Sequence, residues 1–190
     1  MVFYFIVNYQ NTYFILHKNY KIVFYPKIIK IIYMRIIGID PGTAIVGYGV
    51  VDYNDNEINL VASGSVQTPK NVSDAQRLAE ISGDLTEIIN RYSPDIASVE
   101  KLFFFKNQKT VISVAQSRGV ILSVLAKNQI PVYEYTPMQI KLSVTGYGKA
   151  TKDDVAEMVK KMINYEFFPK LDDTADAIAI AVCHIRTCGG

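Results

Sequence analysis

The chain has few cysteines and histidines and no long apolar run. Its 190 residues include two Cys and two His, and Cys183 and Cys188 have a spacing that matches no zinc or redox motif. We expect both to be reduced thiols without an assigned role in a cytoplasmic protein. No apolar run of about 18 residues is present, so we expect no membrane association. A hydrophobic fraction of 49% with 20% charged residues excludes collagen-like, disordered and disulfide-scaffold classes.

Residues 1–33 lack acidic residues and glycine and consist mostly of Phe, Tyr, Ile, Asn and Lys. They have neither the basic start of a secretory peptide nor the Arg and Ser of a transit peptide. We therefore expect the protein to start at Met34, with residues 1–33 a spurious or disordered extension. A membrane-surface or partner-binding arm is the alternative. Residues 34–190 have the length of one domain and contain no repeat or long linker.

Charge gives no general support for nucleic-acid binding. The whole chain carries a net charge of +2, but four of its 20 basic residues and none of its 18 acidic residues fall in residues 1–33. The remainder therefore has 16 basic and 18 acidic side chains, a net charge of −2. Any nucleic-acid site must be a local basic patch or use metal ions.

Changes of period along the chain predict an α/β fold. Apolar runs bounded by turn residues predict five strands, at residues 35–39, 46–53, 58–68, 95–105 and 131–137. Helical spacing predicts helices at residues 73–92 and 107–128, from about residue 151, and at 172–185. The first three strands form an antiparallel meander, and the later alternation of strand and helix implies parallel pairing. The prediction is a mixed five-stranded sheet, three antiparallel strands then two parallel ones, flanked by helices.

Four acidic residues interrupt or end apolar elements. Asp40 ends the first strand, Glu100 lies in the fourth, and Asp173 and Asp176 open the last helix on one face. The first strand of a mixed sheet is commonly central, so these acids are expected to meet at one edge of the sheet. Singly, each also has a structural explanation, because Asp before Pro-Gly is ordinary turn chemistry and Asp is a good helix cap.

A cluster of carboxylates needs a cation, because like charges close together raise one another's pKa. Mg²⁺ prefers oxygen ligands, and two such ions can activate water and stabilise the leaving oxygen of a phosphodiester. That chemistry needs neither His nor Cys. The pattern therefore predicts a magnesium-dependent phosphodiester site.

Aromatic and basic residues near these acids suggest nucleic-acid contacts. Phe103, Phe104 and Phe105 cannot all be buried on one side of a strand, so an exposed ring could stack on an unpaired base. Lysines gather between residues 141 and 161 around the glycines at 146 and 148. They form either a solvated face or a loop that contacts phosphates.

From Met34 to about His184 the chain resembles the RuvC family of Holliday-junction resolvases, a branch of the ribonuclease H-like superfamily. The segments that carry the resemblance are GIDPGTAIVGYGVV (38–51), VEKLFFFKN (99–107), AQSRGVI (115–121) and DDTADAIAIAVCH (172–184). The resemblance implies symmetric nicking of opposing strands of a four-way DNA junction in recombination and repair. Residues 1–33 have no counterpart in the family.

By that resemblance, particular residues acquire roles. The metal-binding catalytic acids would be Asp40, Glu100, Asp173 and Asp176, holding one or two Mg²⁺, for which Mn²⁺ can substitute. Phe103 would enter the junction near the crossover, and Lys141 and Lys152 would contact DNA. The resemblance also implies a homodimer, with the helix from Val111 to Leu125 near the interface, and the branch-migration partners RuvA and RuvB.

Three other functions remain open at this point. A sugar-kinase or actin-like ATPase also places Asp-Gly-Thr in a phosphate-binding turn, but needs a second such domain. A YqgF-type nuclease acting on RNA shares the first motif and the fold. A non-catalytic junction-binding module has no reason to keep acids that repel phosphate.

Overall fold

The computed structural model describes residues 6–9, 12–15, 33–101, 108–165 and 174–188, and the chain divides into two units, Met1–Ile32 and Tyr33–Gly190. In the first unit, β1 (Ile6–Tyr9) pairs antiparallel with β2 (Thr12–Ile15). That the protein starts at Met34 stays a prediction. No helix among the described residues is long and apolar enough to cross a membrane.

The second unit contains one mixed sheet of six strands in the order β7-β6-β3-β4-β5-β8. Its strands are β3 (Tyr33–Asp40), β4 (Ile45–Asn54), β5 (Glu57–Gln67), β6 (Ile96–Glu100), β7 (Val132–Tyr135) and β8 (Ile163–Asn164). The first three pair antiparallel, and β6 and β7 continue the sheet in parallel beyond β3. The five predicted strands are present and β3 is central. The count of five is wrong because the two-residue β8, parallel to β5, is too short to show a period.

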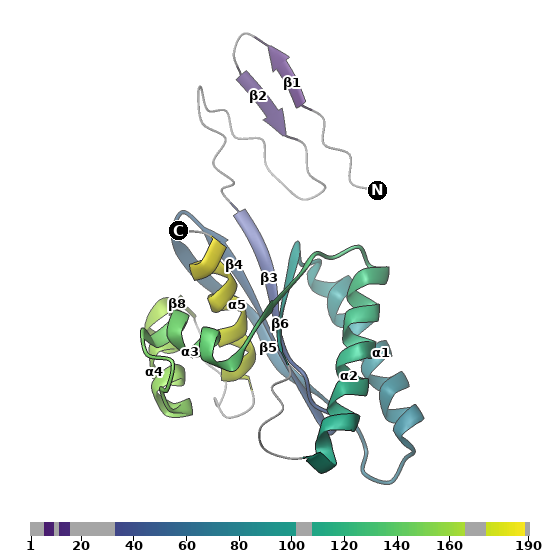
Figure 1. Cartoon of the computed structure of the whole chain (residues 1–190). Helices are drawn as coiled ribbons and strands as arrows, with labels where there is room; N and C mark the ends of the chain where they lie inside the picture. The colour runs from purple at the N-terminus through teal and green to yellow at the C-terminus, as the bar shows by residue number, and fades with distance from the viewer. Residues whose placement is uncertain (1–5, 10–11, 16–32, 102–107, 166–173, 189–190) are drawn as a thin grey trace. The chain divides into compact units, whose positions relative to one another are not determined.

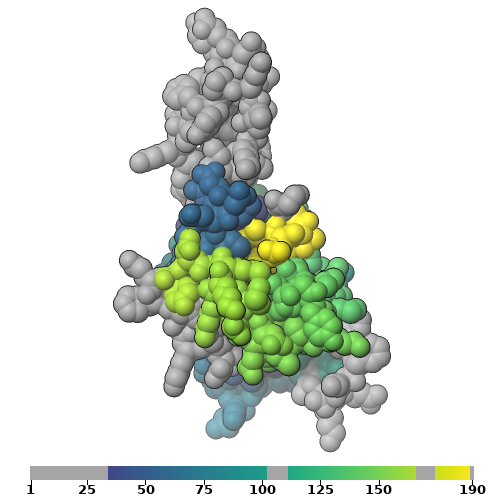
Figure 2. All heavy atoms as spheres, turned by 90° about the vertical axis from the view of Figure 1, so that its left-hand side faces the viewer, coloured from purple at the N-terminus to yellow at the C-terminus, as the bar shows by residue number. Residues whose placement is uncertain are grey.

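Helices cover both faces of this sheet (Figure 1). They are α1 (Asp74–Tyr92), α2 (Gln108–Lys127), α3 (Pro137–Thr145), α4 (Lys152–Met162) and α5 (Ala175–Cys188). Alternation along β3 supplies both cores, since Ile37 and Ile39 pack towards α1 and α2 while Ile36 packs towards α3, α4 and α5. Figure 2 shows α3 in green and α4 in yellow-green side by side on one face.

The sequence predicted neither α3 nor the start of α5. Helix α3 has only nine residues, but Thr136 and Gln139 form a reciprocal capping box and Pro137 occupies its first turn. Helix α5 begins at Ala175 rather than near residue 172, with the Thr174 carbonyl accepting from the N–H of Ile178. Asp176 is therefore its second residue, and Asp173 lies outside the described residues.

Two glycines allow α5 to lie directly on the sheet. A Cβ added to Gly38 in β3 would stand 2.0 Å from the carbonyl oxygen of Ala177, and one added to Gly49 in β4 would stand 2.7 Å from the Ile178 side chain. Any side chain at either position would push the helix away. This close approach sets the first turn of α5 over β3, close to where that strand ends.

Candidate active site

Strands β3 and β6 bring Asp40 and Glu100 together. Their parallel register pairs Ile39 with Val99, so the two acids are the next residues on adjacent strands. Two positions earlier, Gly38 faces α5 and the buried Ser98 hydroxyl donates to the Ile180 carbonyl at 2.8 Å. Because side chains alternate along a strand, Asp40 and Glu100 project to the same face as α5.

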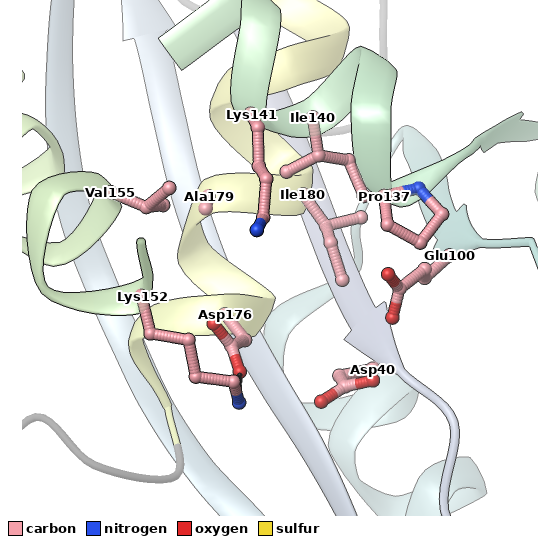
Figure 3. A pocket seen from close by; sticks show the side chains of 10 residues that line it. All are labelled: Asp40, Glu100, Pro137, Ile140, Lys141, Lys152, Val155, Asp176, Ala179 and Ile180. Carbon is pink, nitrogen blue, oxygen red and sulfur yellow. Dashed lines mark hydrogen bonds and ion pairs between the residues drawn. The ribbon is translucent and has the colours of Figure 1, made fainter. Parts of the chain in front are cut away.

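The third acid comes from the first turn of α5. Asp176 faces the same pocket as Asp40 and Glu100, a cavity of about 350 Å³ (Figure 3). Lys141 of α3 and Lys152 at the start of α4 also line it. The remaining walls are apolar and come from α3, α4 and α5, namely Pro137, Ile140, Val155, Ala179 and Ile180.

Burial and mutual repulsion make these carboxylates hard to ionise. Burial, together with the charge of Asp40, raises the pKa of Glu100 to about 8. Burial also raises the pKa of Asp40, although its hydrogen bond with Glu100 acts in the opposite direction. Burial and mutual repulsion thus favour a shared proton on this pair of acids, and a cation in the pocket would favour its release.

Lys152 supplies part of the opposing charge. Its Nζ donates to Asp176 Oδ2 at 2.5 Å, and this bond raises the pKa of the lysine. Three carboxylates nevertheless face two lysines in the pocket. The Lys152 side chain is 79% exposed, so it is also accessible from outside the pocket.

The turn that follows Asp40 is held from two sides. The buried Ser117 hydroxyl of α2 donates to the Gly42 carbonyl at 2.6 Å, and the Thr68 hydroxyl donates to the Thr43 carbonyl at 2.8 Å. Gly42 is needed here, since a Cβ would lie 2.0 Å from the Ile45 carbonyl oxygen. Asp40 thus lies at the junction of the central strand β3 and a turn that hydrogen bonds hold in place.

The donor set is that of a hard divalent cation, which prefers carboxylate oxygens. In the ranges that the structure describes, no three His, Cys, Asp or Glu side chains form a ready-made metal centre. The three acids instead line a common pocket from three separate elements.

Comparison with known proteins decides the family. The family model described as crossover junction endodeoxyribonuclease RuvC matches residues 36–184. The chain belongs to the RuvC family. The RuvC of Fusobacterium nucleatum is 49% identical over 156 residues, 82% of each chain, and that of Halothermothrix orenii is 48% identical over 80% of this chain and 92% of its own.

Solved structures agree with this assignment to the RuvC family. Thermus thermophilus RuvC, in a complex with a Holliday junction substrate, matches with a TM-score of 0.75 and 32% identity over 81% of this chain and 94% of its own. A yeast mitochondrial Holliday junction resolvase matches with a TM-score of 0.62 at 15% identity over 80% of this chain and 78% of its own, which shows a shared fold. The ribonuclease H-like α/β class is confirmed, and RuvC membership displaces the sugar-kinase and YqgF-type alternatives.

The structure brings together most of the residues that the RuvC resemblance singled out. Asp40, Glu100, Asp176, Lys141 and Lys152 line one pocket. Phe103 and Asp173 lie outside the described residues. The catalytic and DNA-binding roles of all seven stay predictions.

Sequence reasoning missed the apolar wall and the ion pair between Lys152 and Asp176. The capping box at Thr136 could have revealed α3, which carries Ile140 and Lys141. The pair spans 24 residues of sequence and had no local signal.

Proposed function

We propose that this protein is a crossover junction endodeoxyribonuclease that resolves Holliday junctions by nicking opposing strands, in recombination and repair. The observation that carries the proposal is the convergence of Asp40, Glu100 and Asp176 on one pocket in a member of the RuvC family. A relative seen with a Holliday junction substrate supports the choice of DNA.

The acids Asp40, Glu100 and Asp176, with Asp173, would hold one or two Mg²⁺ ions, for which Mn²⁺ can substitute. When bound, the metal supplies an activated water and stabilises the leaving oxygen of the phosphodiester. The fit is supported by the all-carboxylate donor set and by the raised pKa of Glu100. Burial and the charge of Asp40 raise that pKa, and a bound cation would offset the repulsion between the two carboxylates. An uncharged replacement of any of these acids would weaken that attraction.

Lysines on the rim would hold the DNA backbone. Lys141 and Lys152 reach the pocket from α3 and α4, where ammonium groups can bind phosphate oxygens and place a strand against the acids. Phe103 follows β6 by three residues and would supply an aromatic contact near the crossover. The roles of the two lysines are supported by their place in the pocket lining, and that of Phe103 by its sequence position three residues after Glu100.

A homodimer would place two such sites on opposing strands. Helix α2 buries Ser117, Ile121 and Leu125 but leaves Ile112, Ala115, Gln116 and Gly119 exposed on its other side. These four recur at helical spacing and so form one face, which we propose as the interface.

Further proposals concern the setting of the nuclease. We propose RuvA and RuvB as its partners and the cytoplasm as its location. We also propose that residues 1–33 are an extension outside the nuclease domain.

The function is tested on synthetic DNA. We expect the protein to cut a four-way junction with paired nicks in magnesium or manganese, to cut linear duplex of the same sequence far more slowly, and to do neither in EDTA. Equal cutting of junction and duplex would contradict the resolvase proposal. Binding without cutting in any divalent metal would favour a non-catalytic junction-binding module.

A further inference from the structure

The loop between α3 and α4 exposes an aromatic side chain, and residues on both sides of this loop in the sequence line the pocket. Residues 146–151 connect the two helices, and Lys141 before the loop and Lys152 after it both line the pocket. Within this loop 61% of Tyr147 is exposed. Its ring contributes little to the core, which leaves it available for a ligand.

The backbone that carries this ring is fixed. Gly146 ends α3 with a φ of +77°. The Thr145 hydroxyl accepts from the N–H of Tyr147 and lies 3.0 Å from the Tyr147 carbonyl oxygen, to which the Ala150 N–H also donates at 3.1 Å. Both backbone polar groups of Tyr147 are therefore engaged. A ligand that uses the ring need not order the loop first, which lowers the entropic cost of binding.

Two further apolar side chains lie on the adjacent part of α3. Met138 and Leu142 are 64% and 54% exposed and stand one helical turn apart. The loop returns to this helix, because a Cβ on Gly148 would lie 3.0 Å from Met138 Cγ. We call Met138, Leu142 and Tyr147 the α3 patch. In the sequence, Lys141 lies between the residues of this patch, and Lys149 and Lys152 follow it.

We propose that Tyr147 is a DNA-contacting residue whose ring stacks on an unpaired base of the strand that enters the pocket, with the rest of the α3 patch flanking that base. The inference rests on the proposed function and extends it to a specific contact. Helix α3 and the start of α4 line the same pocket as Asp40, Glu100 and Asp176, so a strand whose phosphate reaches these acids would lie close to both helices. Lysines there attract its backbone, and an exposed ring offers a surface that any base can stack on.

The experiment compares Tyr147→Ala and Tyr147→Phe with wild type. Affinity for a labelled four-way junction is measured by fluorescence anisotropy, with calcium in place of magnesium so that binding is measured separately from cleavage. Loss of one stacked base predicts a dissociation constant about 5- to 150-fold higher for Tyr147→Ala. Tyr147→Phe keeps most of the affinity, because stacking uses the ring and not the hydroxyl.

Tyr165→Ala is the matched control, since Tyr165 is also a partly exposed tyrosine, at 43%, but follows β8 and lies outside the loop between α3 and α4. It is expected to bind as wild type does. A junction with 2-aminopurine at the crossover adds a direct readout, because stacking quenches its fluorescence and Tyr147→Ala should reduce the quenching. A dissociation constant for Tyr147→Ala within about twofold of wild type would overturn the inference, as would an equal loss in Tyr147→Phe. Neither result bears on cleavage, so failure of the proposed function is recognised separately by the absence of cutting in magnesium.

Discussion

Burial of Glu100 should make the stability of the protein depend on pH. Its folded-state pKa of about 8 stands above the ordinary value of 4.5. Between these values the unfolded chain has lost the proton that the folded protein retains, so stability falls as pH rises. We expect the melting temperature in EDTA to fall by several degrees from pH 5 to pH 8, since 1 kcal/mol corresponds to about 2–4 °C for a domain of this size.

Glu100→Gln provides the control for that titration, because the amide does not ionise and the pH dependence should flatten. Magnesium should raise the melting temperature of the wild type more at pH 8 than at pH 5, since it binds the ionised acids. A wild-type melting temperature that rises across this interval in EDTA would show that Glu100 is not held protonated by its surroundings.

Some residues of the candidate site could be predicted from the sequence, and others could not. Asp40 and Glu100 were predicted because an acid at the end of an apolar strand is conspicuous, and the parallel register brings both to the same face. The hydrogen bond from Ser117 to the Gly42 carbonyl joins residues 75 positions apart. No local pattern indicates such a contact, since it depends on how α2 packs against the sheet.

Among the helices and strands, two glycine substitutions should change stability in opposite directions, because Gly38 lies against α5 and Gly83 has open space around it. Gly38→Ala should destabilise the fold by about 1–3 kcal/mol or more, since the new Cβ would collide with the backbone of α5 at Ala177 and Ala181. Because α5 also carries Asp176, cleavage should fall as well. Urea unfolding and junction cleavage measure the two effects.

Gly83→Ala is the matched control. Gly83 lies inside α1 with open space where its Cβ would be, so alanine should stabilise by about 0.5–1 kcal/mol and leave cleavage unchanged. Equal stability of the Gly38→Ala and Gly83→Ala proteins would argue against the close approach of α5.

Long elements with clear periods were predictable and short ones were not. Helix α1 shows buried Ile81, Leu85 and Ile89 at helical spacing behind a Ser73 cap. Strand β8 and helix α3 are too short to show a period, and α3 was detectable only through its capping box. Because α3 was not predicted, the apolar side chains that it contributes to the pocket, Pro137 and Ile140, were not predicted either.

At the scale of the whole molecule, the exposed face of α2 predicts how two copies meet. Ile112 is 69% exposed, and a charge there would have to be desolvated in an interface. We expect Ile112→Asp to sediment as a monomer where the wild type sediments as a dimer. The monomer should make unpaired nicks, because the second site is lost. A dimeric Ile112→Asp protein would mean that copies meet through another surface.

We expect the pocket of Asp40, Glu100 and Asp176 to perform the cleavage. The most direct measurement is the single-turnover rate of Asp40→Asn on a four-way junction in magnesium, at protein concentrations that saturate binding. We expect a rate at least about 100-fold below that of wild type, with junction affinity retained and the fold intact. A mutant that binds and cuts at the wild-type rate would place the chemistry elsewhere in the molecule.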